Sequence, residues 1–163
     1  MTRAKVPARG FVARKHEHAA CVQAAISAAE SACARSGQRL TALRRRVLEL
    51  VWNSHEPVKA YQLLDELRAE RARAAPPTVY RALEFLVNEG LVHRLESMSA
   101  FVGCVDPRRR HEGQFLICNA CGVVAEIDDP ALSERIGSRA RRMGFTVQRQ
   151  TVEVAGLCPQ CQA

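Results

Sequence analysis

The amino-acid sequence predicts an α+β protein with an N-terminal winged helix-turn-helix domain and a small C-terminal α/β domain clamped by four cysteines. Residues 16–104 contain helical repeats of apolar residues followed by two short alternating segments, which is the element order of a winged helix. Residues 113–163 contain strand-like segments, one further helix and two C-x-x-C pairs. Residues 105–112 are predicted to be a hinge, and residues 1–15 a disordered basic tail.

Four helices are expected in the N-terminal domain, because apolar residues recur there at intervals of three and four. In the first helix, Cys21 and Cys33 are expected to belong to the apolar core. The fourth helix has the clearest boundaries, since Pro76-Pro77 suits a helix start and Gly90 suits the position just past a helix end. The other three segments are residues 17–35, a helix capped by Thr41 and broken by Pro57, and residues 59–71.

Strands are predicted in both domains. Leu91–Glu96 and Ala100–Cys104 alternate between apolar and polar residues and are joined by three residues, which predicts a β-hairpin as the wing. The C-terminal domain is predicted to contain strands at Gln114–Cys118, Val123–Ile127 and Thr146–Ala155, with a helix at Ala131–Met143.

The charge of the chain is uneven and indicates a polyanionic partner. The net charge of +7 falls within residues 1–112, because residues 113–163 carry equal numbers of basic and acidic residues. A basic domain suits nucleic acid, although arginines that only solubilise the surface would give the same count. No apolar segment follows the basic N-terminus, and no apolar run reaches the roughly 18 residues of a membrane span. A cytoplasmic location without membrane contact is therefore expected.

The cysteines indicate a metal site. Their number, seven, is odd, which favours metal binding in a reducing compartment over a disulfide framework. Four of them form two C-x-x-C pairs, Cys118 with Cys121 and Cys158 with Cys161. Two such pairs make a tetrahedral four-thiolate shell that suits zinc. Because protein ligands fill every position of this shell, the site is predicted to be structural and not catalytic.

Residues at three helix starts are candidates for DNA contacts. Those near the start of the fourth helix are placed to reach base edges, as in other recognition helices. The alternatives are that Tyr80 packs into the core, that Arg81 is only solvated, and that the Tyr61 ring is partly buried. The candidates are Thr78, Tyr80 and Arg81 for bases, Tyr61 for the backbone or a thymine methyl group, and Arg44, Arg45 and Arg46 for phosphates.

A second metal site is suggested by dispersed residues. His93 lies in the first wing segment and Cys104 at the end of the second, while His111 and Glu126 flank the first C-x-x-C pair. Two imidazoles, a thiolate and a carboxylate make an acceptable tetrahedral zinc shell. Each residue also has an ordinary structural interpretation, so the residue pattern alone leaves this site open.

Three motifs resemble the Fur family of metal-dependent repressors, and most closely its zinc-sensing branch. They are Arg39-Leu40-Thr41 with Arg44, Pro76-Pro77-Thr78-Val79-Tyr80-Arg81, and Phe115-Leu116-Ile117-Cys118-x-x-Cys121-Gly122. The resemblance covers roughly residues 20–161. It implies a homodimer joined through the C-terminal domain and two zinc ions per chain. The structural zinc would be held by Cys118, Cys121, Cys158 and Cys161, and the regulatory zinc by His93, Cys104, His111 and Glu126.

The same resemblance implies that Arg81 and Tyr61 reach purines in a pseudo-palindromic operator. The sequence departs from the family pattern at Ala42, where a proline is usual, and in a histidine-rich stretch that is reduced to His111. The second departure argues against the iron-sensing branch. A thiolate at Cys104 likewise favours zinc over iron(II) or manganese(II).

The expected function is therefore a zinc-responsive repressor of zinc-uptake genes, with no enzymatic activity and no small-molecule substrate. One alternative is a Fur-family sensor of iron or manganese, and another is a zinc-stabilised RNA- or ribosome-binding module. A zinc hydrolase is disfavoured, because the sequence contains no H-E-x-x-H motif. On the third helix, Asp65 and Arg68 are expected to form a surface ion pair, with a contact between two dimers on one operator as the alternative.

Overall fold

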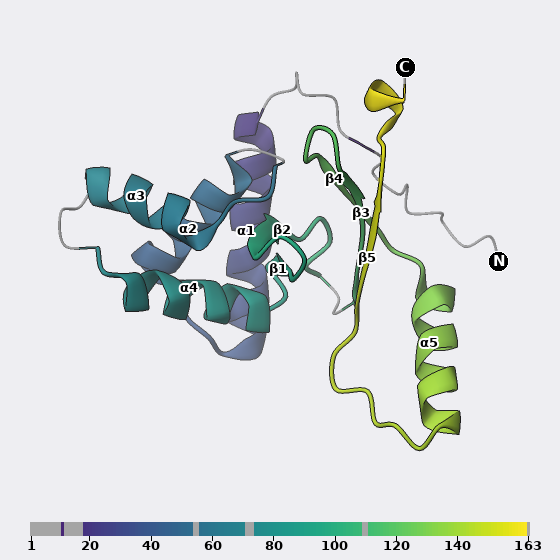
Figure 1. Ribbon diagram of the computed structural model, residues 1–163. Coiled ribbons are helices and arrows are strands. Elements are labelled where there is room, and N and C mark those ends of the chain that lie inside the picture. The colour runs from purple at the N-terminus through teal and green to yellow at the C-terminus, as the bar shows by residue number, and fades with distance from the viewer. Residues whose placement is uncertain (1–10, 12–17, 54–55, 71–73, 109–110, 163) are drawn as a thin grey trace. The chain divides into compact units, whose positions relative to one another are not determined.

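The computed structural model describes residues 11, 18–53, 56–70, 74–108 and 111–162 (Figure 1). The predicted basic tail, residues 1–15, lies almost entirely outside these ranges. The chain divides into two compact units, the first ending at Arg110 and the second beginning at His111. The first unit contains helices and a two-stranded hairpin, and the second a three-stranded sheet with one helix, which confirms the predicted mixed α+β class. Within the described ranges, no helix combines the length and the apolar character that crossing a bilayer requires.

Four helices form the first unit. They are α1 (His18–Ser36), α2 (Ala42–Trp52), α3 (Ala60–Glu70) and α4 (Pro76–Asn88). The hydroxyl of Thr41 accepts from the backbone N–H of Arg44 and so caps α2, as predicted. Gly90 follows α4 with φ of 71°, a left-handed conformation that ends the helix and favours glycine. The apolar faces of all four helices share one core, to which Cys33 and the half-buried Cys21 belong.

The wing completes the first unit. Strands β1 (Val92–Leu95) and β2 (Ala100–Gly103) pair antiparallel, with His93 opposite Val102. The outer edge of β2 is also bonded to the segment before α3, because Val58 and Phe101 exchange two backbone hydrogen bonds of 2.9 and 2.8 Å. Backbone hydrogen bonds therefore join β2 to β1 on one side and to the segment before α3 on the other.

The second unit is a three-stranded sheet with one helix. Its elements are β3 (Gly113–Cys118), β4 (Val124–Ile127), α5 (Pro130–Arg142), β5 (Thr151–Gly156) and a 3₁₀ turn, η1 (Pro159–Cys161). The strand order is β4-β3-β5, with β4 antiparallel and β5 parallel to the central β3. In Figure 1, β5 runs beside β3 at the C-terminal end of the chain, and α5 occupies the connection between β4 and β5.

A buried glutamine joins this helix to the sheet. The side chain of Gln114 in β3 is only 1% exposed. Its amide nitrogen donates to the carbonyl oxygen of Asp129 and to the hydroxyl of Ser133, both at 2.8 Å, and its oxygen accepts from the N–H of Asp129 at 3.2 Å. Asp129 is the N-cap of α5. The start of α5 is thereby fixed to the central strand.

Two sequence predictions are corrected. The last strand starts at Thr151 and not at Thr146, because Thr151 pairs with Gly113, the first residue of β3, so that residues 146–150 have no strand beside them. The expected ion pair between Asp65 and Arg68 does not form within the described residues. Arg68 instead donates from Nε to the carbonyl oxygen of Ala74 at 3.2 Å, in the segment that leads to α4.

Candidate metal centres and nucleic-acid interface

The two C-x-x-C pairs meet because β3 and β5 are parallel. Cys118 is the last residue of β3 and lies opposite Gly156, the last residue of β5. The two C-x-x-C pairs therefore lie at the same end of these neighbouring strands. A hydrogen bond of 2.8 Å from the N–H of Asn119 to the carbonyl oxygen of Gly156 joins the two turns. Gly122, with φ of 74°, closes the first turn.

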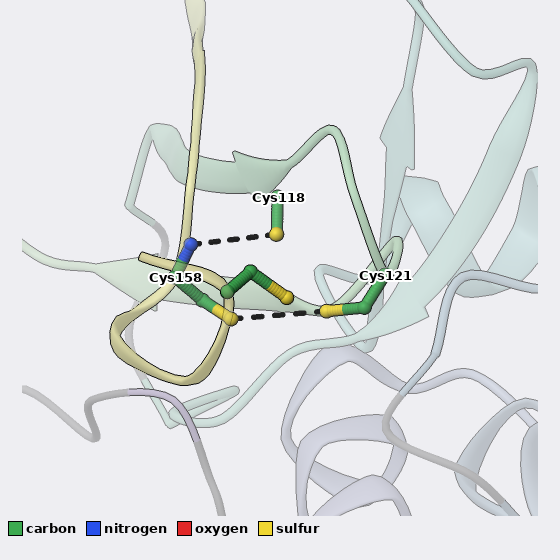
Figure 2. Close-up of side chains that lie close together, drawn as sticks. Cys118, Cys121 and Cys158 are labelled. Carbon is green, nitrogen blue, oxygen red and sulfur yellow. Dashed lines mark hydrogen bonds between the residues drawn. The ribbon is translucent and has the colours of Figure 1, made fainter. Parts of the chain in front are cut away.

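The four predicted cysteine ligands are brought together with spacing that fits zinc. Their sulfur atoms all lie within 4.8 Å of one another. The sulfurs of Cys121 and Cys158 are 3.8 Å apart (Figure 2). Two sulfurs that each stand about 2.3 Å from a tetrahedral zinc ion would be about 3.8 Å apart. The donor set and its spacing thus fit a closed four-thiolate zinc site.

The electrostatics of the cluster also suit a cation. The backbone N–H of Cys158 donates to the sulfur of Cys118 at 3.3 Å, as Figure 2 shows. This bond, with help from the N–H of Cys121, lowers the pKa of the Cys118 thiol to about 6. Hydrogen bonds to the neighbouring sulfurs of Cys158 and Cys121 hold the proton of Cys161 and raise its pKa to about 12. One sulfur is thus a thiolate at neutral pH, and a divalent cation would displace the proton of another.

Two of the four predicted regulatory ligands meet in the second unit. His111 precedes β3, and Glu126 lies on the neighbouring strand β4. The Nε2 atom of His111 and the Oε1 atom of Glu126 are 2.6 Å apart, and both side chains are buried. An imidazole and a carboxylate in direct contact inside the protein form half of a zinc shell.

The other two predicted ligands share one face of the wing. Cys104 follows β2, and its N–H donates to the carbonyl oxygen of Leu91 at 3.0 Å, which continues the ladder by one residue. His93 lies opposite Val102, two residues before Cys104. Because side chains alternate between the faces of a strand, His93 and Cys104 project from the same face as diagonal neighbours. The hairpin therefore positions an imidazole and a buried thiol as a second half-shell.

The candidate base-reading residues are exposed near the starts of two helices. Tyr61 in α3 and Tyr80 in α4 are each 59% exposed, so neither ring packs into the core. Thr78 and Arg81 share the exposed side of α4, opposite the buried Val79. Among the described residues, Arg81 has no hydrogen-bond or ion-pair partner. Its guanidinium group is therefore available to an external acceptor.

The three arginines at the start of α2 have partners inside the first unit. Arg44 donates to the carbonyl oxygen of Arg39 at 2.7 Å, and its guanidinium carbon lies 3.5 Å from the centroid of the Phe85 ring in α4. Arg45 pairs with Glu30 of α1 across an exposed surface. Arg46 pairs with Glu70 of α3 and with Glu49, the latter at 2.9 Å. These arginines tie α2 to its neighbouring helices.

Comparison with known proteins gives the family. The model of the ferric uptake regulator family matches residues 35–155. The chain belongs to the ferric uptake regulator family. It is 38% identical over 140 residues to the zinc uptake regulation protein of Escherichia coli K12, which covers 85% of this chain and 82% of that protein. The resemblance inferred from the three motifs is confirmed, and the protein is a regulator and not an enzyme.

Solved structures of family members match most of the chain. A zinc uptake regulator complexed with zinc and DNA matches with a TM-score of 0.82 at 37% identity, over 86% of this chain and 95% of that one. The holo form of XcZur matches with a TM-score of 0.78 at 46% identity, over 84% of this chain and 96% of that one. The apo form of XcZur matches with a TM-score of 0.51 over 87% and 98% of the two chains.

A set of exposed apolar residues on the second unit was missed by the sequence reasoning. Helix α5 has no buried residue, although it contains apolar side chains. β5 is an edge strand, and four of its six residues are exposed. The signal was present in the pair of large apolar residues around Gly144, where the helix ends. The exposed apolar residues on α5, on β5 and just after each of them, which we together term the α5–β5 face, are Ile136, Met143, Phe145, Val154 and Leu157.

Proposed function

We propose that this protein is a zinc-responsive transcriptional repressor that binds operator DNA as a zinc-loaded homodimer and represses zinc-uptake genes in the cytoplasm. The observation that carries the proposal is the second donor set, with His93 and Cys104 on the wing and His111 in contact with Glu126 in the other unit. If ligands from both units bind one metal ion, DNA binding would depend on that metal. Similarity to a zinc uptake regulator complexed with zinc and DNA supports the same function.

Zinc is proposed as the metal of both centres, giving two ions per chain. Cys118, Cys121, Cys158 and Cys161 would hold the structural ion, because four thiolates leave no open position. His93, Cys104, His111 and Glu126 would hold the regulatory ion. The thiolate of Cys104 is the discriminating ligand, since sulfur favours zinc over the harder iron(II) and manganese(II) ions.

A homodimer is supported by the α5–β5 face. Large apolar side chains exposed along one helix end and one edge strand mark a surface that a partner covers. An exposed edge strand offers unpaired backbone groups as well. A second copy of the chain would cover both, so residues 113–163 are proposed as the dimerisation domain. Two copies related by a twofold axis would match a pseudo-palindromic operator, with half-sites about one helical turn apart.

DNA reading is proposed for the exposed residues of α3 and α4. Arg81 and Tyr61 would reach base edges, while Thr78 and Tyr80 would support them near the start of the recognition helix. Arg44 and Arg45 are proposed as phosphate contacts. Arg45 would exchange Glu30 for a phosphate, which is feasible because both partners are exposed.

The regulatory residues would act by fixing the first unit relative to the dimerisation domain. When His93 and Cys104 share a metal with His111 and Glu126, the two recognition helices of a dimer are held at one spacing. Without that link, the arrangement that binds DNA becomes a minor population.

The testing experiment is operator binding titrated against buffered free zinc, iron(II) and manganese(II), with metal counting on the same samples. We expect two zinc ions per chain and operator binding that follows free zinc alone. Cys104→Ser should abolish the zinc response while the dimer stays folded, and Cys21→Ser is the matched control, because Cys21 lies half-buried in the helical core. One zinc per chain with metal-independent binding would instead favour the nucleic-acid-binding module, and a response to iron or manganese would favour another sensor.

A further inference from the structure

The wing packs against Trp52, the only tryptophan of the chain. Trp52 is the last residue of α2, and Gly103 is the last residue of β2. A methyl group built on Gly103 would lie 2.7 Å from Cζ2 of Trp52 and closer still to Nε1 and Cε2. The indole therefore occupies the space that any other side chain at position 103 would need, and the backbone of β2 lies directly against it.

The contact between Gly103 and Trp52 lies on the opposite face of the hairpin from the proposed metal ligands. Gly103 pairs with Val92, and both belong to the face that includes Phe101. The adjacent residues His93 and Cys104 belong to the other face. A single peptide bond thus separates a proposed zinc ligand from the residue that rests on α2.

The same strand is fastened to the start of α3. Phe101 exchanges two hydrogen bonds with Val58, and α3 begins two residues later at Ala60. Cys104 is therefore connected to the helix-turn-helix through two contacts of β2, one with Trp52 at the end of α2 and one with Val58 before α3. Among the described residues, these two contacts lie between Cys104 and the helix that carries the exposed Tyr61.

We propose that the contact between Gly103 and Trp52 is the positioning contact that couples the regulatory metal site to the DNA-reading helices. Trp52 and Gly103 touch neither metal nor DNA. They act by holding β2 rigidly on α2, so that ligation of Cys104 moves or restrains the helix-turn-helix as one body. This inference rests on the proposed zinc-responsive function, and it assigns the route by which that response travels within the first unit.

The test is a thermodynamic cycle on the intact, reduced protein. Zinc affinity at the regulatory site is measured by competition with a chelator, with and without operator DNA, and operator affinity with and without zinc. For the wild type the two ratios must be equal, because coupling between two ligands is reciprocal. Gly103→Ala should reduce this ratio by about 2- to 30-fold, the range in which residues along a coupling route act. Ser31→Ala is the control, because Ser31 lies exposed on α1 of the same unit, outside both the metal sites and the DNA-reading helices.

Two further variants separate coupling from simple damage. Trp52→Leu combined with Gly103→Ala should restore much of the coupling ratio, because a leucine side chain ends at its δ carbons and has no atoms at the positions of Nε1, Cε2 and Cζ2. Trp52→Leu alone should lower the ratio, since the space beside Gly103 is then only partly filled, and it replaces Gly103→Ala in the test if Gly103→Ala does not fold. A merely structural role would weaken operator binding equally with and without zinc, and would leave the ratio unchanged.

Tryptophan emission gives an independent readout. Zinc has no redox or optical transitions of its own, so a change in Trp52 emission on filling the regulatory site would report a change around the indole. We expect such a change in the wild type and none in Cys104→Ser. A wild-type coupling ratio that survives in Gly103→Ala would overturn this inference while leaving the proposed function intact. A wild type without any zinc dependence would overturn the proposed function, and the inference with it.

Discussion

Arg81 offers the sharpest test of how this protein would read DNA. It is exposed on α4 and, within the part of the chain that the structure describes, has no hydrogen-bond or ion-pair partner. Its replacement by alanine should therefore leave the free energy of unfolding unchanged, apart from a small gain in helix propensity. Any loss of DNA affinity can then be assigned to the contact itself.

The size of that loss follows from the number of contacts. A bidentate arginine–guanine pair contributes about 1–3 kcal/mol of discrimination. The proposed dimer contains two copies of Arg81, so Arg81→Ala should weaken operator binding by about 2–6 kcal/mol, which is at least about 30-fold. Binding to random DNA should fall far less, because only a general electrostatic contribution is removed.

Arg45→Ala is the matched comparison. Arg45 already pairs with Glu30, and the two side chains are 39% and 51% exposed, so exchanging this partner for a phosphate yields little net free energy. We expect operator and random DNA to lose affinity about equally and the salt dependence to become shallower. The assay is fluorescence anisotropy with both DNAs, in saturating zinc, over a range of salt concentrations. Equal losses for operator and random DNA in Arg81→Ala would refute its role in base reading.

Three further outcomes are expected. Cys158→Ser should dissociate the dimer, because loss of the structural zinc removes a contribution on the order of 10 kcal/mol from the second unit, and a full dimer by gel filtration would contradict this. Gln114→Leu, similar in volume, should lower the urea-unfolding free energy by about 2–3 kcal/mol through the loss of three hydrogen bonds, whereas an unchanged midpoint would show that water replaces them. The depressed pKa of Cys118, about 6 in the folded state against an ordinary 9.0, contributes stability that is complete above about 9 and lost as pH falls through about 6. The urea midpoint of the metal-free protein should therefore rise between pH 6 and pH 9, and a flat profile would count against a folded-state thiolate.

Local signals allowed most of the helices to be predicted. Pro76-Pro77 and Gly90 bracket α4, and Thr41 caps α2, because these residues act through their own backbone or their nearest neighbours. The start of β5 was mispredicted, since it is set by Gly113 on a strand that is distant in sequence. Pairing across the chain leaves no local trace in residues 146–150.

The site was predictable to the extent that spacing encodes it. Cys118 and Cys121 form a unit that can be recognised alone, but their meeting with Cys158 depends on the parallel pairing of two strands. The surface arginines were less predictable. Whether a side chain such as Arg44 points to solvent or lies over Phe85 depends on how two helices pack, which composition does not specify.

The parallel pairing of β3 and β5 also decides the topology of the second unit. Cys118 and Cys158, which are 40 positions apart, close a loop that contains β4, α5 and β5. Every residue of the α5–β5 face lies inside this loop. The loop should open and close as one cooperative segment, which zinc bound by the four cysteines would hold closed. Subunit association would then depend on how much of this site is occupied by zinc. Prolonged chelation should therefore produce monomers without any change in salt or pH.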